Sequence, residues 1–260
     1  MLIHLVADYG AGDLAFAEVT QRLVGLIDDA AVVPVPVPAF DTVSAGFCAA
    51  QLALGGQGRG TGLVYVNVAP RAGQPDPRPG NQGERLVAAF CDNGLPVVSV
   101  NAGYCLSFLA PRARFYQPDV PDSGSQFRSR DIFPAVVAAL ASGRSDEAGP
   151  ELPAELVPPP PAEAVCYVDG YGNLKTTYTS APVPAGAQVE VTVGGAVTVA
   201  RVADGTFEVP QGEMSFAPGS SGWAVRGVEQ RFYELLVRGG SAAQRFGYPR
   251  AGAPVQVCPA

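Results

Sequence analysis

The pattern of apolar positions divides the chain into two parts, a first in which short strands alternate with helices and a second built of strands. In the first part, residues 2–7 form an apolar run, and apolar side chains then recur at spacings of three and four as far as residue 27, which is typical of one face of a helix. Residues 31–38 contain three prolines, which cannot donate to a ladder, so we expect an edge strand or an extended segment there. Asp41 is suited to cap a helix over residues 42–54.

The same alternation continues to about residue 141. Residues 63–68 predict another strand, and residues 86–92 are expected to pair with residues 97–100. A helix is predicted to open within residues 127–133 and to reach about residue 141. The first part therefore has the order of elements of an α/β domain.

The second part is predicted to be all β. Residues 186–210 alternate in short segments rich in valine and threonine, which Gly194-Gly195 and Asp204-Gly205 interrupt in the manner of hairpin turns. Further strands are predicted at residues 223–225, 233–237 and 255–257. The predicted domains are an α/β domain over residues 1–157, a proline-rich linker over 158–163 and a β domain over 164–260.

Composition narrows the classes of partner. The 260 residues are 47% hydrophobic and carry a net charge of -7, which argues against nucleic acid or an anionic membrane as the main partner. The single histidine, His4, lies in an apolar strand, so a histidine triad or metal cluster has no basis and no metal site is predicted. The five cysteines are scattered and odd in number, which favours buried thiols and a reducing cytoplasm. The first residues lack a basic leader, so we expect no secretory signal.

Two loops of the first part carry polar residues with two possible uses. Asp8 and Asp13 follow the first strand in a glycine-containing loop, where a carboxylate either accepts hydrogen bonds from ribose hydroxyls or caps the next helix. Arg128 and Ser129 stand at the start of a later helix, where either the two bind an anion or Ser129 is the N-cap of the helix. From the residues alone we expect Ser129 to be the N-cap.

A third polar loop follows the linker. Residues 166–177 predict two short strands joined by a glycine turn that carries Asp169 and Asn173. These two side chains offer acceptors and an amide directed at one place, as in a ligand site, and they are equally common in ordinary hairpin turns.

Several stretches repeat, in order, the motifs of a known family. Residues 7–13 read Ala-Asp-Tyr-Gly-Ala-Gly-Asp, against Thr-Asp-Phe-Gly-x-x-Asp, and residues 127–133 read Phe-Arg-Ser-Arg-Asp-Ile-Phe, against Phe-His-Gly-Arg-Asp-Ile-Phe. Residues 168–174 read Val-Asp-Gly-Tyr-Gly-Asn-Leu, against Ile-Asp-x-Phe-Gly-Asn-Leu, residues 240–243 match Gly-Ser-Ala-Ala, and residues 92–95 give a weaker match. The chain resembles the S-adenosylmethionine (SAM) hydroxide adenosyltransferases, the adenosine-forming SAM hydrolases, which are related to fluorinase and chlorinase.

The resemblance implies a fold, an assembly and a reaction. The fold is a Rossmann-like domain followed by a small β-barrel, in a homotrimer whose sites lie between subunits. The reaction is in-line attack of a nucleophile on the ribose 5′ carbon of SAM, a small-molecule nucleoside substrate, with methionine leaving and no cofactor. A sulfonium is already a good leaving group, so the protein has mainly to orient the ribose and the nucleophile.

The resemblance also implies roles for individual residues. Asp8 matches the ribose-binding carboxylate, and Asn173 with the Ser241-Ala242 backbone matches the adenine contacts. Asp13 and Asp169 match acidic residues near the methionine amino group. The full set of expected substrate-binding positions is Asp8, Asp13, Phe40, Asp169, Tyr171, Asn173, Glu229, Ser241 and Ala242.

The positions that hold hydroxide in the hydrolases depart from the motif. Ala69 stands at the family's aspartate, Arg71 at a glycine and Arg128 at the histidine, while Ser129 stands where hydrolases have glycine and fluorinase has a serine that contacts halide. A gapless alignment puts Glu229 in the segment that contacts the methionine part. The expected catalytic residues are therefore Arg71, Arg128 and Ser129.

These departures leave three interpretations of the function. The first is adenosyl transfer to an anion bound by the arginines, and the second is hydrolysis with a different arrangement around the water. The third is a catalytically inactive protein that binds SAM or adenosine. The arginines would then simply pair with Asp76 or Asp131.

Overall fold

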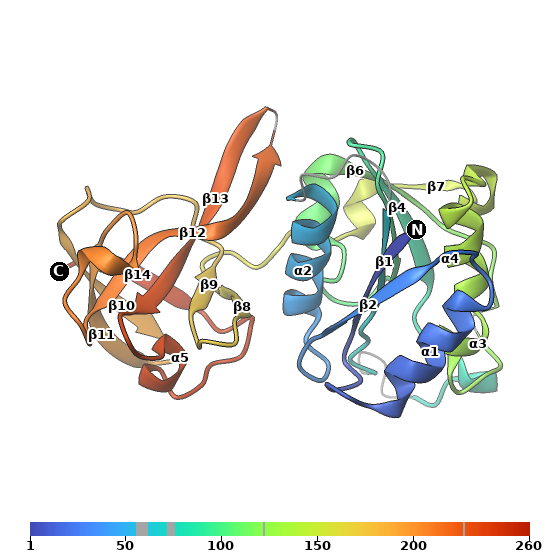
Figure 1. Ribbon diagram of the computed structural model, residues 1–260, viewed down its shortest axis with the longest axis horizontal. Helices are drawn as coiled ribbons and strands as arrows, with labels where there is room; N and C mark the ends of the chain where they lie inside the picture. Colours follow the sequence, from blue (N-terminus) through green and yellow to red (C-terminus); the bar gives the residue numbers. More distant parts are fainter. Residues whose placement is uncertain (56–61, 72–75, 122, 226) are drawn as a thin grey trace. The chain divides into compact units, whose positions relative to one another are not determined.

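The chain forms two compact units, residues 1–160 and residues 161–260 (Figure 1). The computed structural model describes residues 1–55, 62–71, 76–121, 123–225 and 227–260. Each unit contains one mixed sheet of seven strands, and helices are few. The protein is therefore an α/β fold with two sheet-rich units.

The sheet of the first unit has the order β2-β1-β3-β5-β4-β6-β7. Strands β2, β1, β3 and β5 are parallel, and β4, β6 and β7 continue the sheet in antiparallel pairs. The strands are β1 (Leu2–Ala7), β2 (Ala31–Pro36), β3 (Gly62–Asn67), β4 (Leu86–Cys91), β5 (Pro96–Val100), β6 (Ala113–Tyr116) and β7 (Glu151–Leu152). The expected edge strand is confirmed as β2, and the expected pairing of residues 86–92 with 97–100 is confirmed as β4 with β5.

Helices cover both faces of this sheet, with α2 on one face and α1 and α4 on the other (Figure 1). Asp41 begins α2 as predicted, because its side chain accepts a hydrogen bond from the Ser44 amide at 2.8 Å. The helices of the unit are α1 (Leu14–Val24), α2 (Thr42–Leu54), α3 (Arg128–Asp131) and α4 (Pro134–Ala141). Short 3-10 segments are η1 (Pro79–Asn81), η2 (Ser107–Arg112), η3 (Ser145–Ala148) and η4 (Ala154–Leu156).

The helix predicted from residue 127 to residue 141 is in fact two helices. The single turn α3 ends before Pro134, which begins α4 at a position where its missing N–H costs nothing. Ser129 lies inside α3 and is not its N-cap, so that expectation was wrong. The physical reason is a tertiary contact, because the Ser129 hydroxyl is a partner of Tyr9.

The sheet of the second unit has the order β14-β10-β11-β12-β13-β9-β8 and curls into a half-barrel. Backbone hydrogen bonds join the two edges, from the Val165 amide to the Ala253 carbonyl at 2.9 Å and from the Val255 amide to the Glu163 carbonyl at 2.6 Å. The elements are β8 (Val165–Val168), β9 (Leu174–Thr176), β10 (Gln188–Val193), β11 (Ala196–Val202), η5 (Thr206–Glu208), β12 (Met214–Val225), β13 (Val228–Val237), α5 (Ala242–Arg245) and β14 (Val255–Pro259).

The core of the second unit follows the two-residue period of its strands. Val189, Val191 and Val193 of β10 alternate with exposed or half-buried neighbours and pack with Phe216 and Leu235. This alternation is the one that the valine- and threonine-rich pattern predicted. The strands expected on either side of Gly194-Gly195 and at residues 223–225, 233–237 and 255–257 are thus confirmed. The hairpin expected at Asp204-Gly205 was wrong, because residues 206–208 form η5 and β11 pairs with β12 in parallel.

The helices and the cysteines can be compared with what the composition predicted. Within the described ranges, no helix is long and apolar enough to cross a membrane. The thiols of Cys48, Cys91, Cys105 and Cys166 are buried, whereas that of Cys258 is exposed. The expectation of mostly buried thiols is therefore confirmed.

Candidate functional site

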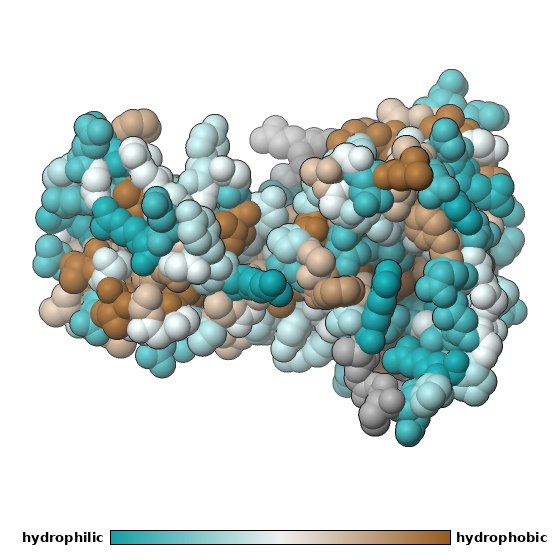
Figure 2. Space-filling model, turned by 90° about the horizontal axis from the view of Figure 1, so that it is seen from below, coloured by the Kyte–Doolittle hydropathy of each residue, from teal (hydrophilic) through white to brown (hydrophobic). Residues whose placement is uncertain are grey.

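The candidate site of the first unit is a cavity of about 630 Å³ at the carboxyl ends of β1 and β3. The strand order reverses here, since β2 lies on one side of β1 and β3 on the other. In open α/β sheets ligands bind at such a switch point, in the crevice outside the carboxyl ends of the strands. Figure 2 views the unit from the side on which β1 ends and shows many hydrophilic residues there. The polar residues that matter below are Asp8, Tyr9, Arg71, Arg78, Arg128 and Ser129.

A larger hollow, of about 760 Å³, lies along β4 and β6. Its charged side chains, Arg112 and Asp92, already form a bidentate ion pair with each other. We therefore place the site by topology and by the polar groups that face the space, and not by volume.

Asp8 joins the loop after β1 to Phe40. The Phe40 amide donates to Oδ2 of Asp8 at 2.9 Å, and Phe40 has a φ of 64°, a left-handed conformation that is costly for a bulky residue. The aromatic ring is 52% exposed beside this contact. Among the described residues, Oδ1 of Asp8 has no hydrogen-bond partner, so it is an acceptor available to a ligand hydroxyl.

Two tyrosines hold Ser129. The Tyr9 hydroxyl donates to Ser129 Oγ at 2.7 Å, and the Tyr65 hydroxyl donates to the Ser129 carbonyl at 2.9 Å. Burial raises the pKa of both phenols, so both remain protonated donors at neutral pH. Ser129 itself is 5% exposed. Ser129 is thus fixed at both its side chain and its main chain.

Arg128 is fixed by neutral groups. Its Nη1 donates to the Glu84 carbonyl and its Nη2 to the Pro121 carbonyl, each at 3.1 Å, while the guanidinium lies 4.7 Å from the centre of the Phe133 ring. Gly83 leaves the room for it, because a Cβ there would stand 2.3 Å from Nη1. Any side chain at Gly83 would displace Arg128.

The other two cavity arginines differ in their environment. Arg78 lies 3.7 Å from Glu84 in an ion pair. Arg71 is exposed and has a φ of 55°, in the left-handed region, at the position where the resembled motif has glycine. Asp131, which was expected as a possible partner of the cavity arginines, pairs instead with Arg130.

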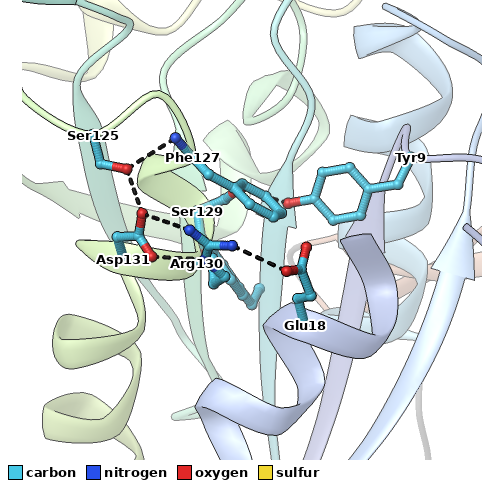
Figure 3. A network of polar contacts seen from close by, with 8 residues as sticks. Tyr9, Glu18, Ser125, Phe127, Ser129, Arg130 and Asp131 are labelled. Atoms are coloured by element: carbon cyan, nitrogen blue, oxygen red, sulfur yellow. Dashed lines mark hydrogen bonds and ion pairs between the residues drawn. The ribbon is translucent and has the colours of Figure 1, made fainter. Parts of the chain in front are cut away.

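Arg130 links α1 to α3 next to the site, as Figure 3 shows. It donates to Glu18 at 3.1 Å and to Asp131 at 2.7 Å, and it lies 4.8 Å from the centre of the Phe127 ring. Phe127 in turn meets Tyr9 edge to face at 5.9 Å. The motif stretch 127–133 is therefore connected to the loop after β1 by charge and by aromatic contact.

The Asp131 carboxylate makes stability depend on pH. Hydrogen bonds from Arg130 and Ser125 lower its pKa from 3.8 to about 2, so its contribution is complete above pH 4 and is lost as the pH falls through 2. We expect Asp131→Asn to lower the urea midpoint of unfolding at neutral pH. The difference between the midpoints of the variant and the wild type should vanish near pH 2. Far-UV circular dichroism measures it. Asp28→Asn, at an exposed position, is the control, and a difference independent of pH would contradict the assignment.

The second unit contains another polar cluster, in the turn between β8 and β9. Oδ1 of Asp169 accepts from the amides of Tyr171 and Asn173 at 2.9 and 3.0 Å, and Oδ2 accepts from Asn173 Nδ2 at 2.9 Å. The predicted hairpin turn is confirmed. Because Asp169 holds the amide nitrogen of Asn173, the oxygen of that side chain is left as an acceptor with no partner among the described residues.

This turn packs against the segment at the start of α5. The Ala243 amide donates to the Gly172 carbonyl at 2.8 Å, and a Cβ at Gly172, whose φ is 81°, would stand 2.1 Å from Ser241 Oγ. Only glycine allows this approach. Asn173, Ser241 and the buried Ala242 are thereby brought together, and the Tyr171 ring beside them is 84% exposed.

Comparisons with known proteins find similar folds but no protein whose function is described. No model of a known protein family and no curated protein sequence matches the chain. A crystal structure of an uncharacterized conserved protein from Thermotoga maritima is similar, with a TM-score of 0.76 and 20% identity over 98% of this chain and 100% of that one. A conserved hypothetical protein from Thermus thermophilus has a TM-score of 0.70 and 26% identity over 98% of both chains. The likeness is one of fold.

Two expected binding residues lie outside both clusters. Asp13 caps α1, accepting from the Ala15 amide at 2.8 Å. Glu229 is exposed at the start of β13, where it pairs with Arg231 at 3.4 Å, on a hairpin that extends away from α5 (Figure 1). Their expected contacts with the methionine part stay predictions.

The tyrosines that organise the first cluster carry little signal in the sequence. Tyr65 is hidden in an apolar strand, and nothing in the pattern distinguishes it from core. Tyr9 carried a signal, because it stands at the phenylalanine of the resembled motif and adds a hydroxyl. Among the described residues, no group of three or more histidine, cysteine or acidic side chains is placed to hold a metal ion.

Proposed function

We propose that the protein binds SAM and catalyses nucleophilic displacement at its ribose 5′ carbon, releasing methionine. One observation carries the proposal. The four main stretches of the resemblance, which are far apart in the sequence, converge in the structure into two polar clusters, one in each unit. Residues that form motifs by coincidence would have no reason to meet in this way.

In the first unit, Asp8 is the proposed ribose ligand. Asp8 lines the cavity after β1, and a carboxylate at this place in an α/β sheet is suited to accept hydrogen bonds from ribose hydroxyls. The Phe40 amide fixes the carboxylate through Oδ2. The finer description of this unit as Rossmann-like rests on the parallel order β2-β1-β3-β5.

In the second unit, Asn173 is the proposed adenine ligand. Asp169 turns the amide so that its oxygen is available to the exocyclic amino group of adenine. The exposed ring of Tyr171 offers an aromatic face for the base. The description of this unit as a small barrel rests on the hydrogen bonds of Val165 with Gly252 and Ala253 and of Val255 with Glu163, which connect the two edges of the sheet.

The proposed chemistry needs orientation more than acid or base. The nucleophile's electron pair forms the bond to the 5′ carbon, the carbon–sulfur bond breaks, and its pair neutralises the sulfonium as methionine leaves. The nucleophile is a small anion, or water, which in addition gives up one proton to the solvent as adenosine forms. A homotrimer with sites between subunits follows from the resemblance, and sedimentation velocity tests it.

Binding tests this proposal first. We expect calorimetric titration to detect binding of SAM and of adenosine. Asn173→Ala should weaken the affinity for adenosine about tenfold, because one well-oriented hydrogen bond is lost. Thr179→Ala, in the same unit but outside the cluster, is the matched control. The proposal falls if neither ligand binds to the wild type at millimolar concentration.

A second candidate function is binding without catalysis. It is favoured by Ala69 and Arg128, which replace the aspartate and histidine that the resembled hydrolases use to hold hydroxide. Binding of SAM with no release of methionine would support it.

Restoring those two side chains distinguishes the candidates. We expect Ala69→Asp with Arg128→His to raise adenosine formation at least about tenfold, because a positioned base commonly contributes more than that. Chromatography of the products measures it, with Ala69→Asp alone as the control. A folded double variant that releases no more adenosine than the wild type would argue that the cavity does not present the 5′ carbon.

A further inference from the structure

The larger hollow of the first unit lies away from the candidate site. This space of about 760 Å³ follows β4 and β6 and includes Gly94, in the turn before β5. Because β5 runs parallel to β1 and β3, that turn lies at the edge of the sheet opposite to the one where β1 and β3 end. Small-molecule sites commonly have volumes of about 300–1,000 Å³, so the hollow is large enough for a ligand of its own.

Two aromatic rings line this hollow. Phe90 on β4 and Tyr116 on β6 meet edge to face, with 5.5 Å between the ring centres, and both side chains are half-buried. They share one face of the sheet, because Tyr116 stands opposite Ala88, two residues before Phe90, and side chains two apart in a strand point to the same face. Half-exposed rings of this kind suit the flat apolar body of a ligand.

Arg114 supplies the charge for a ligand in this hollow. It stands directly opposite Phe90 in the register of β4 and β6, so its side chain leaves the sheet on the same face. Arg114 is exposed, and among the described residues no carboxylate lies within ion-pair distance of its guanidinium. The neighbouring Arg112, by contrast, is neutralised by Asp92 in a bidentate pair. Arg114 is thus available to an anion.

The other polar groups of the hollow also favour a ligand that accepts hydrogen bonds. The side-chain hydroxyls of Tyr116 and Ser145 have no hydrogen-bond partner among the described residues, so both can donate to a ligand. The two carboxylate oxygens of Asp92 already accept from Arg112. A guanidinium and two hydroxyls beside an occupied carboxylate match a ligand that is negatively charged and rich in acceptors.

We propose that this hollow binds a small organic anion, whose flat ring lies against Phe90 and Tyr116 and whose carboxylate or phosphate group pairs with Arg114. The planar guanidinium matches either anionic group in bidentate geometry. The chain has a net charge of -7, so its overall field does not attract such a ligand and the local contacts supply the affinity. The site is separate from the cavity after β1 and goes beyond the proposed function.

Crystals soaked with 4-bromobenzoate locate the ligand. We expect an anomalous bromine peak beside the rings of Phe90 and Tyr116, with the carboxylate at the Arg114 guanidinium, and no peak in crystals of Arg114→Gln. Arg85→Gln is the matched control, because it removes an exposed arginine of the same unit just before β4, and it should retain the peak. No bromine peak, or a peak only in the cavity after β1, would overturn the proposal.

Calorimetric titration measures the affinity in solution. Benzoate should bind at least about tenfold more weakly to Arg114→Gln than to the wild type, because a charge-assisted contact is lost, whereas Arg85→Gln should bind it like the wild type. Acetate, which has the charge without the ring, should bind to the wild type at least about tenfold more weakly than benzoate does. Equal affinities of the wild type and Arg114→Gln for benzoate, or of the wild type for acetate and benzoate, would overturn the proposal.

Phenyl phosphate distinguishes the two kinds of anion. Tighter binding of phenyl phosphate than of benzoate would assign the hollow to phosphate esters, and the reverse order would assign it to carboxylic acids; Arg114→Gln should weaken both. These outcomes are independent of the proposed function. Benzoate in the hollow of a protein that does not bind SAM would leave this inference standing, and release of methionine by a protein whose hollow binds neither anion would overturn this inference alone.

Discussion

Replacing Asp8 with asparagine is expected to lower kcat/KM for methionine release from SAM by at least about hundredfold while the protein stays folded. The asparagine oxygen can still accept from the Phe40 amide, which holds the loop. Its NH2 group then faces the cavity, where a ribose hydroxyl needs an acceptor. Two hydrogen bonds to a charged group are worth about 3 kcal/mol or more, which corresponds to the expected factor.

Asp92→Asn is the matched control for this substitution. Asp92 is a carboxylate of the same unit that pairs with Arg112 outside the cavity, so the rate should be unchanged. Equal rates for Asp8→Asn and the wild type would remove Asp8 from the site. A lower unfolding midpoint for Asp8→Asn would instead assign the lost activity to folding.

Replacing Glu234 with leucine is expected to lower the free energy of unfolding of the second unit by about 3–5 kcal/mol. Glu234 on β13 stands opposite Lys175 on β9, and the two side chains form an ion pair with only 4% and 9% exposure. Removing the carboxylate leaves a buried ammonium without compensation, which is among the most destabilising single changes known. Gly219 makes room for the pair, since a Cβ there would stand 1.9 Å from Glu234 Oε1.

The lysine partner supplies the test of this explanation. Lys175→Met combined with Glu234→Leu should recover most of the loss, because no charge remains buried. Urea unfolding followed by tryptophan fluorescence measures the effect in the right unit, because the only tryptophan, Trp223, lies in β12. A double variant as unstable as Glu234→Leu would show that packing, and not the unpaired charge, is responsible.

Local rules were enough to predict much of the fold. The prolines of residues 31–38 exclude a central strand, and Asp41 marks a helix start whatever surrounds it, so β2 and α2 were predicted almost to the residue. The break before Pro134 was not foreseen because the apolar pattern continues through it. Apolar periodicity indicates which face of a helix is buried, but it does not reveal a break of one turn between two helices.

The candidate site was less predictable because its geometry is tertiary. Ser129 is a good cap by composition, and only the approach of Tyr9, brought near by the strand order, gives it another role. Asp169 was expected to contact substrate, yet both its oxygens are used to build the turn that presents Asn173. Sequence motifs named the right stretches, whereas the partners of each side chain depended on the fold.

Release of methionine is the most direct measurement of the central claim. The wild-type protein is incubated with SAM in the presence and absence of bromide, and methionine and all nucleosides are quantified by chromatography. We expect methionine and one nucleoside, adenosine or its 5′-substituted analogue, in equal amounts and in proportion to enzyme. Methionine at the level of spontaneous SAM breakdown in every condition would contradict it.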